Sequence, residues 1–217
     1  MRTKVILVRH GQSLGNAKRV LLGHTDLDLS ELGYAQARAT AEALKDEKID
    51  AIYSSDLMRA MNTAVPHARL RGMEVIPDVR LREVMLGEWE GHSVEQILEL
   101  YGEKAYTEDW LGGFGTFTFP GGDRVMDRAG IFFAEVKSLC EQNEGKTLLI
   151  ASHAAVIRGF FGKVRGLADE EVVTGTEFPS NASYSVVYYE NGGFTEAEFS
   201  VDGHLSSVGI TKLNQTV

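Results

Sequence analysis

The chain has 217 residues, 43% of them hydrophobic and 24% charged, a globular balance that predicts a single domain over residues 1–217. The formal net charge of −9 argues against nucleic acid or an anionic membrane as a partner, so an anionic substrate would need a locally basic pocket. A lone cysteine, Cys140, excludes an internal disulfide and a cysteine-rich metal site, and the lack of a signal run or membrane span indicates a cytoplasmic protein.

The first half of the chain alternates between short apolar runs and segments of helical periodicity. Residues 5–8 form a continuous apolar run, which is typical of a strand buried on both faces. Ser30 is placed to cap the next helix, whose predicted apolar face consists of Leu32, Ala35, Ala39 and Ala43. A short strand is expected over 51–53. It is followed by a helix over 57–70 that Pro66 kinks or divides.

The second half repeats this alternation and ends in a hairpin. A capping box over 93–96 begins one helix, and Asp123 is placed to cap a longer one. A second fully buried strand is expected over 147–151, before an apolar helix. Residues 184–200 read as a hairpin. Strands that alternate with helices predict a mostly parallel sheet covered on both faces, with an antiparallel addition near the C-terminus.

One long segment, 102–122, fits neither pattern. It is rich in glycine and aromatic residues and shows no clear period. Loops of this length inside a compact domain are uncommon and usually functional. We therefore expect either a lid or insertion over the functional site, or a surface excursion that packs its own aromatic side chains.

Polar residues collect where three predicted strands end. Arg9 and His10 follow the first strand, Arg59 lies one helical turn beyond the second, and His153 follows the third. Each alone would be an ordinary polar residue leaving the core. Because the carboxyl ends of parallel strands line one edge of a sheet, where ligands bind, we expect two histidines and two arginines to converge there.

This combination of side chains suits phosphoryl transfer. Arginine presents forked donors that match phosphate oxygens, and a histidine that is neutral near pH 7 can act as the nucleophile. The reaction also requires a proton donor for the leaving oxygen. Glu83, Glu88 and Glu90 are the candidates, and their positions along the sequence do not separate them.

A series of short motifs runs in order over residues 4 to about 190. It consists of Arg9-His10-Gly11 with Asn16, Gly23-His24-Thr25-Asp26, Ser54-Ser55-Asp56 with Arg59, Leu81-Arg82-Glu83, Pro120-Gly121-Gly122-Asp123, Ser152-His153 and Asn181-Ala182-Ser183. This series resembles the histidine phosphatase superfamily, the group that includes phosphoglycerate mutase. One such motif is a weak signal, whereas the ordered series is specific.

The resemblance implies a three-layer α/β/α sandwich of the phosphoglycerate mutase-like type, with no metal and no cofactor. It makes His10 the residue that is phosphorylated during turnover and Glu83 the proton donor. The phosphate ligands that it implies are Arg9, Ser13, Asn16, Arg59 and His153.

Two positions depart from the family pattern. Ala154 stands where glycine usually follows the second histidine, which puts a methyl group beside a backbone N–H expected to approach phosphate. A basic residue often found between Asn16 and Gly23 is displaced by one position, to Arg19, so we do not count Arg19 as a ligand.

The stretch after Glu83 favours a phosphatase over a mutase. Residues 83–87 lack the Arg, His and Tyr that mutases of this family carry there, and the chain is short for a mutase. We therefore expect hydrolysis of a small phosphorylated metabolite, a phosphomonoester. A phosphoglycerate mutase and a non-catalytic binding protein on the same fold are the alternatives. The sequence identifies neither the substrate nor the oligomeric state, for which a homodimer is one option.

Overall fold

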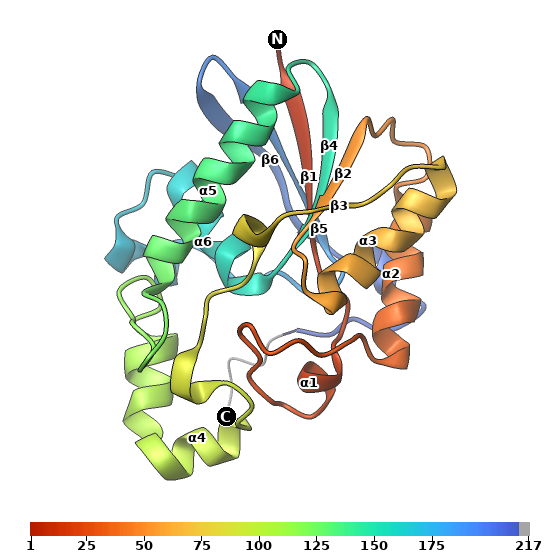
Figure 1. Cartoon of the computed structure of the whole chain (residues 1–217). Coiled ribbons are helices and arrows are strands. Elements are labelled where there is room, and N and C mark those ends of the chain that lie inside the picture. Colours follow the sequence, from red (N-terminus) through yellow and green to blue (C-terminus); the bar gives the residue numbers. More distant parts are fainter. Residues whose placement is uncertain (213–217) are drawn as a thin grey trace.

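A six-stranded sheet forms the centre of the molecule in the computed structural model, which describes residues 1–212 (Figure 1). The strands are β1 (Thr3–Arg9), β2 (Ala51–Ser54), β3 (Ile76–Pro77), β4 (Thr147–Ser152), β5 (Tyr184–Glu190) and β6 (Gly193–Val201). Their order across the sheet is β3-β2-β4-β1-β5-β6. The first four strands run parallel and the last two join antiparallel. The predicted sheet is confirmed, including its antiparallel C-terminal hairpin.

Helices cover both faces of this sheet, α2 and α3 on one side and α5 and α6 on the other (Figure 1). The α-helices are α1 (Leu14–Ala17), α2 (Glu31–Ala43), α3 (Met58–Arg71), α4 (Val94–Tyr101), α5 (Val125–Gln142), α6 (Ala154–Val164) and α7 (Val172–Gly175). Short helical turns are η1 (Val79–Leu81), η2 (Gly87–Trp89), η4 (Asp169–Glu171) and η5 (Gly203–Leu205), and η3 (Ala105–Leu111) is a π-helix. The predicted three-layer α/β/α sandwich is confirmed.

The continuous apolar run of β1 divides its side chains between two cores. Val5 and Leu7 belong to the large core beneath α5 and α6, whereas Ile6 and Val8 belong to the smaller core beneath α3. All four are essentially inaccessible to solvent. Burial of each contributes about 1.5–3 kcal/mol, so β1 is held firmly from both sides. Its carboxyl end, which carries Arg9, is therefore a rigid support.

The buried face of α2 differs from the predicted one. Ser30 caps the helix as expected, but Leu32, Ala35 and Ala39 are only half-buried and Ala43 is exposed. The face that packs inward consists of Gly33, Gln36, Ala37, Thr40 and Ala41. The small side chains allow close approach to the loop after β1. Gln36 accepts the N–H of Gln12 in that loop, and the Thr40 hydroxyl donates to the carbonyl of Ala182, just before β5. The prediction from apolar spacing alone was therefore wrong about which face of α2 is buried.

One alternative predicted for α3 and the predicted cap of α5 need correction. α3 runs through Pro66 as one helix, so Pro66 does not divide it, and the alternative of a kink there stays a prediction. Asp123 does not cap α5: the N-cap is Arg124, without a side-chain cap, and the Asp123 carboxylate accepts the N–H of Met85 at 2.8 Å. Asp123 thus ties the start of α5 to the segment that follows Glu83. The capping box before α4 is confirmed.

The segment 102–122 is more ordered than its sequence predicts. It contains the π-helix η3, and its side chains Trp110, Phe114 and Phe119 are buried in the large core. A π-helix follows neither the 3.6-residue nor the 2-residue period, so a search for those periods misses it. Its aromatic rings pack against one another and against the core.

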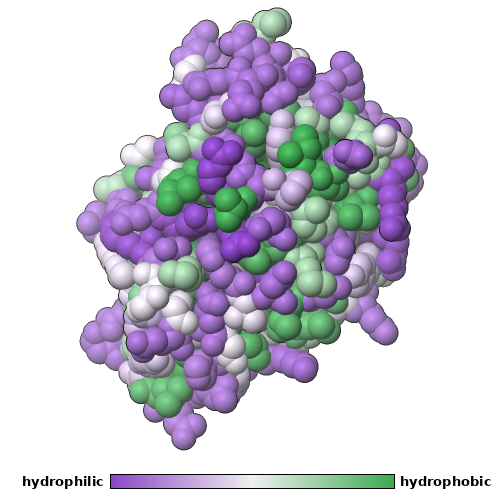
Figure 2. Space-filling view, viewed as in Figure 1, coloured by the Kyte–Doolittle hydropathy of each residue, from purple (hydrophilic) through white to green (hydrophobic). Residues whose placement is uncertain are grey.

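The surface shows no single apolar face in the view of Figure 2, where apolar and hydrophilic side chains are interspersed. Scattered apolar surface of this kind is normal for a folded domain. Along residues 1–212, every helix falls short of the length and apolarity needed to cross a bilayer.

Candidate active site

The three polar strand ends meet at one edge of the sheet, as expected. β4 lies between β1 and β2, and its last residue pairs with Arg9. The backbone N–H of His10 donates to the carbonyl of Ser152 at 2.9 Å, which fixes the first residue beyond β1. The rings of His10 and His153 lie edge to face, with centroids 5.2 Å apart.

An inner cavity of about 80 Å³ opens at this edge. Five of the predicted site residues line it: Arg9, His10, Asn16, Arg59 and Glu83. The other two lie behind the wall. Ser13 is buried and its hydroxyl caps α1 by accepting the N–H of Asn16 at 3.0 Å, while His153 is buried beside His10 and bonds to Ser55.

His10 is held as a neutral imidazole. Its Nδ1 lies 2.7 Å from the carbonyl oxygen of Gly11, which can only accept, so Nδ1 carries the proton and Nε2 keeps its lone pair. Burial, followed by the charges of Arg59 and Arg9, lowers the pKa of His10 well below its ordinary value. An unprotonated ring nitrogen is therefore present at neutral pH.

His153 shares this environment. Burial first, and then Arg59, lowers its pKa well below the ordinary value. Its Nε2 lies 2.8 Å from the hydroxyl of Ser55, and its Nδ1 has no partner among residues 1–212. A buried ring nitrogen without a partner is able to bind a ligand atom.

Two buried arginines make the cavity cationic. Arg9 and Arg59 are 2% and 1% exposed, and burial lowers the pKa of each to about 10, so both remain charged at neutral pH. Within residues 1–212, the Arg59 guanidinium donates to two backbone carbonyls only, those of Gly23 at 2.7 Å and Thr25 at 3.0 Å. Arg9 donates to the carbonyl of Pro179, and its Nε has no partner among the described residues. Both guanidinium groups keep donors for an anion.

The carboxylate of Glu83 sits at the start of α6. It accepts the N–H groups of Ala155 at 3.0 Å and Val156 at 3.1 Å, where the helix dipole favours negative charge. These two amides therefore bind Glu83 and are not free for phosphate. Ala154, the departure noted in the sequence, is one of the residues that line the cavity.

The structure separates the three candidate proton donors. Glu83 lines the inner cavity with His10. Glu88 is exposed and accepts from the hydroxyl of Tyr101. Glu90 accepts from the N–H groups of His24 and Leu86 and from the hydroxyl of Thr25. Of these three carboxylates, Glu83 is the one that lines the inner cavity.

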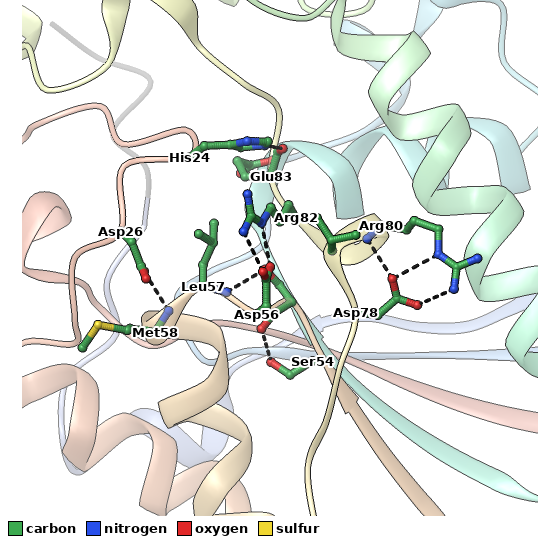
Figure 3. Close-up of polar contacts among 12 residues, drawn as sticks. His24, Asp26, Ser54, Asp56, Leu57, Met58, Asp78, Arg80, Arg82 and Glu83 are labelled. Atoms are coloured by element: carbon green, nitrogen blue, oxygen red, sulfur yellow. Dashed lines mark hydrogen bonds and ion pairs between the residues drawn. The ribbon is translucent and has the colours of Figure 1, made fainter.

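Ion pairs and hydrogen bonds hold the Glu83 backbone on both sides (Figure 3). The neighbouring Arg82 makes a two-pronged contact with Asp56, with both N–O distances at 2.6 Å. His24 Nε2 lies 2.8 Å from the Glu83 carbonyl oxygen and donates to it. Because Asp56 follows β2, the proton donor candidate is anchored to the same strand ends as the histidines.

Sequence reasoning assigned no role to Asn181 or Phe178, which both help to build the site, whereas Tyr106 and Trp110 belong to the segment 102–122 that was expected over the site. The Asn181 amide donates to the His10 carbonyl and to Asn16 Oδ1, at 3.1 and 3.2 Å. Asn181 stands in the motif series, which could have pointed to it. The aromatic wall of the inner cavity is formed by Tyr106, Trp110 and Phe178. Phe178 lies in irregular chain and gave no periodic signal.

The sequence profile of the histidine phosphatase superfamily (branch 1) matches residues 5–202. The chain belongs to the histidine phosphatase superfamily. The match spans nearly all of the described chain and agrees with the geometry above. The family expected from the motif series is thereby confirmed.

Known members of the superfamily resemble this histidine phosphatase over most of its length. Phosphoserine phosphatase 1 of Hydrogenobacter thermophilus is 33% identical over 93% of this chain and 94% of its own. A probable phosphoglycerate mutase of Photorhabdus laumondii is 32% identical over 76% of this chain and 75% of its own. The Entamoeba histolytica phosphoserine phosphatase in complex with 3-phosphoglyceric acid is 30% identical, with a TM-score of 0.81 over 94% of this chain and 99% of that one. The prediction of an enzyme of the phosphatase class is confirmed.

Proposed function

We propose that this histidine phosphatase hydrolyses small phosphomonoesters through a phosphohistidine on His10. One observation carries the proposal: a neutral His10, with its Nδ1 proton engaged, lines a cavity shared with two buried arginines and one carboxylate. A neutral nucleophile beside fixed cations is suited to attack on a phosphoryl group, whose negative charge the cations stabilise.

The reaction follows from these positions. Arg9, Arg59 and Asn16, which line the inner cavity, hold the phosphoryl oxygens. A contact of phosphate with His153, which lies behind the cavity wall, stays a prediction. His10 Nε2 attacks phosphorus while the bond to the leaving oxygen breaks, and Glu83, which must be in its protonated form at this step, gives that oxygen a proton. Glu83 then takes a proton from water, which attacks the phosphohistidine. Phosphate leaves and His10 is restored. Ser13 supports Asn16 through the α1 cap, and a direct contact of Ser13 with phosphate stays a prediction.

A phosphatase is favoured over a mutase by the stretch after Glu83. Met85 is exposed and Leu86 presents an apolar side chain to the cavity, so this stretch adds no cation to hold a second phosphorylated intermediate. With 3-phosphoglycerate as substrate, phosphate should appear and 2-phosphoglycerate should not. Isomerisation faster than phosphate release would support the mutase.

The first experiment uses an aryl phosphate with EDTA present throughout. Wild type should turn over, His10→Ala should lose activity entirely, and Glu83→Gln should lose most activity on alkyl phosphates. His67→Leu, which removes a buried histidine outside the cavity, is the matched control and should retain the wild-type rate. Turnover that survives His10→Ala would overturn the proposed nucleophile, and inhibition by EDTA would overturn metal independence.

We also propose one domain over residues 1–217, a cytoplasmic location and a lid role for 102–122. The single central sheet supports the first, and Tyr106 and Trp110 on the cavity wall support the last. Limited proteolysis with and without phosphate tests the single domain and the lid. Cell fractionation tests the cytoplasmic location. Analytical ultracentrifugation determines whether the chain forms a homodimer.

A further inference from the structure

An outer cavity of about 330 Å³ adjoins the inner one, and the two share Arg9, Asn16 and Tyr106 on their walls. A substrate whose phosphoryl group sits at His10 would extend its leaving group into this space. The outer cavity is therefore the place where the leaving group is recognised.

The charges on the outer wall are of one sign. Arg9, Arg19 and Lys212 line the cavity, and within residues 1–212 no carboxylate does. This is notable in a chain that has 31 acidic and 22 basic residues. Arg9 is already needed at the inner cavity, so Arg19 and Lys212 are the cations left for a second anionic group.

Arg19 has an unusual backbone conformation. Its φ of 54° is left-handed, at the point where α1 ends and Val20 N–H returns to the carbonyl of Gly15 at 2.9 Å. Glycine is the favoured residue at such a helix end, and an arginine there is strained. Strain of this kind gathers at functional sites, and here the residue in question presents a cation to the cavity.

The guanidinium of Arg19 is available to a ligand. Its partner is Glu95 at 3.1 Å, and the two side chains are 51% and 62% exposed. Ion pairs this exposed contribute little to stability, so a ligand anion can share or replace the partner. Lys212 is similarly loosely held, 3.9 Å from Asp202.

The segment of the cavity wall that carries Lys212 is hydrogen-bonded to Asn181 and Gln36. The carbonyl of Thr211 accepts the N–H of Asn181 at 2.8 Å. The buried Gln36 amide donates to the Gly209 carbonyl at 2.8 Å and to the Thr211 hydroxyl at 3.1 Å. The segment 209–212, which lines the same cavity as Arg19, is thus held by Asn181 and Gln36, and these residues also contact Asn16 and the loop after β1.

We infer that the outer cavity binds an anionic group on the leaving group, a carboxylate or a second phosphate, through Arg19 with added charge from Lys212. The inference rests on the proposed phosphatase activity and deepens it. It makes Arg19 the residue that determines specificity, although its displacement from the family position had removed it from the predicted ligands.

The test compares substrates that differ only in this group. Wild type should prefer 3-phosphoglycerate over glycerol 3-phosphate in kcat/KM by roughly tenfold or more, the size of one charge-assisted hydrogen bond. A second comparison, fructose 1,6-bisphosphate against fructose 6-phosphate, tests whether a second phosphate is preferred in the same way. The pair with the larger ratio of kcat/KM values identifies the anion that the cavity binds. Raising the salt concentration should reduce the ratio.

Arg19→Gly separates recognition from backbone strain. It relieves the left-handed conformation, so the fold should be at least as stable, yet the preference for the anionic substrate should fall to near one because kcat/KM for 3-phosphoglycerate falls far more than kcat/KM for glycerol 3-phosphate. Lys212→Gln should reduce the preference less, and Glu95→Gln should increase it. Lys18→Ala removes a neighbouring exposed cation that does not line the cavity and should change nothing.

The outcomes distinguish the inference from the function on which it rests. If no phosphoester is hydrolysed and His10→Ala changes nothing, the proposed function is wrong. If wild type hydrolyses both members of each pair equally, or if Arg19→Gly keeps the preference, the function stands and the anionic subsite is refuted.

Discussion

His67 makes a quantitative prediction about acid stability. This residue of α3 is completely buried, and neither ring nitrogen has a hydrogen-bond partner among residues 1–212. Burial is the main cause that lowers its pKa to about 3, with smaller contributions from Arg71 and His204. The folded protein therefore keeps His67 neutral at a pH where the unfolded chain protonates it.

The direction and size of the effect follow from proton linkage. Above the unfolded pKa of about 6.5 both states are neutral, so His67 causes no pH dependence. As the pH falls below that value only the unfolded state binds the proton, and stability is lost until the folded pKa is reached. At pH 5, about 1.5 units below the unfolded pKa at about 1.36 kcal/mol per unit, the loss is about 2 kcal/mol.

His67→Leu removes this titration with little change of volume. Between pH 7 and pH 5, the free energy of unfolding should fall by about 2 kcal/mol less in the variant than in wild type. Urea denaturation at the two pH values measures this difference, and between pH 8 and pH 7 the two proteins should change equally. If both proteins lose the same stability down to pH 5, His67 is not held neutral and the reasoning from its burial fails.

Further predictions concern catalysis and the core. Arg82→Gln should lower kcat more for alkyl than for aryl phosphates, because a displaced Glu83 matters most when the leaving group is poor. Asp56→Asn, which removes the other partner of that ion pair, should have the same effect. Arg80→Gln, which alters a different ion pair in the same segment, should not. In a protein that already carries Glu83→Gln, the further change Arg82→Gln should have no effect on kcat. Steady-state kinetics with substrates whose leaving groups differ in pKa measure both effects. Because the pKa of His10 is lowered well below 6.5, protonation of His10 should cause no loss of kcat/KM between pH 7.5 and 5.5, and a fall centred near 6.5 would contradict its neutral state. Phe114→Ala should cost about 3–5 kcal/mol of stability, read from urea midpoints, because this fully buried ring packs in the large core; a loss below about 1 kcal/mol would place it outside the core.

Local sequence patterns determined the framework of this protein. The apolar runs of β1 and β4 identify strands buried on both faces, because alternation is lost when both sides of a sheet are covered. The capping box before α4 involves only side chains and amides within one turn, so it is visible in the sequence. The strand ends then brought Arg9, His10 and His153 to one edge by topology alone.

Only the tertiary structure decided which residues at that edge line the cavities and what holds them there. Glu83 was indistinguishable from Glu88 and Glu90 until α6 supplied the amides that hold its carboxylate. The buried face of α2 depends on Gln36, whose partners lie near residue 12 and beyond residue 208. Arg19 has a left-handed backbone and lines the outer cavity together with residues 210–212, which are distant in the sequence. In each case the contacting residues lie far away along the chain. A local sequence pattern cannot predict that a polar group is buried when its hydrogen-bond partners come from a distant segment.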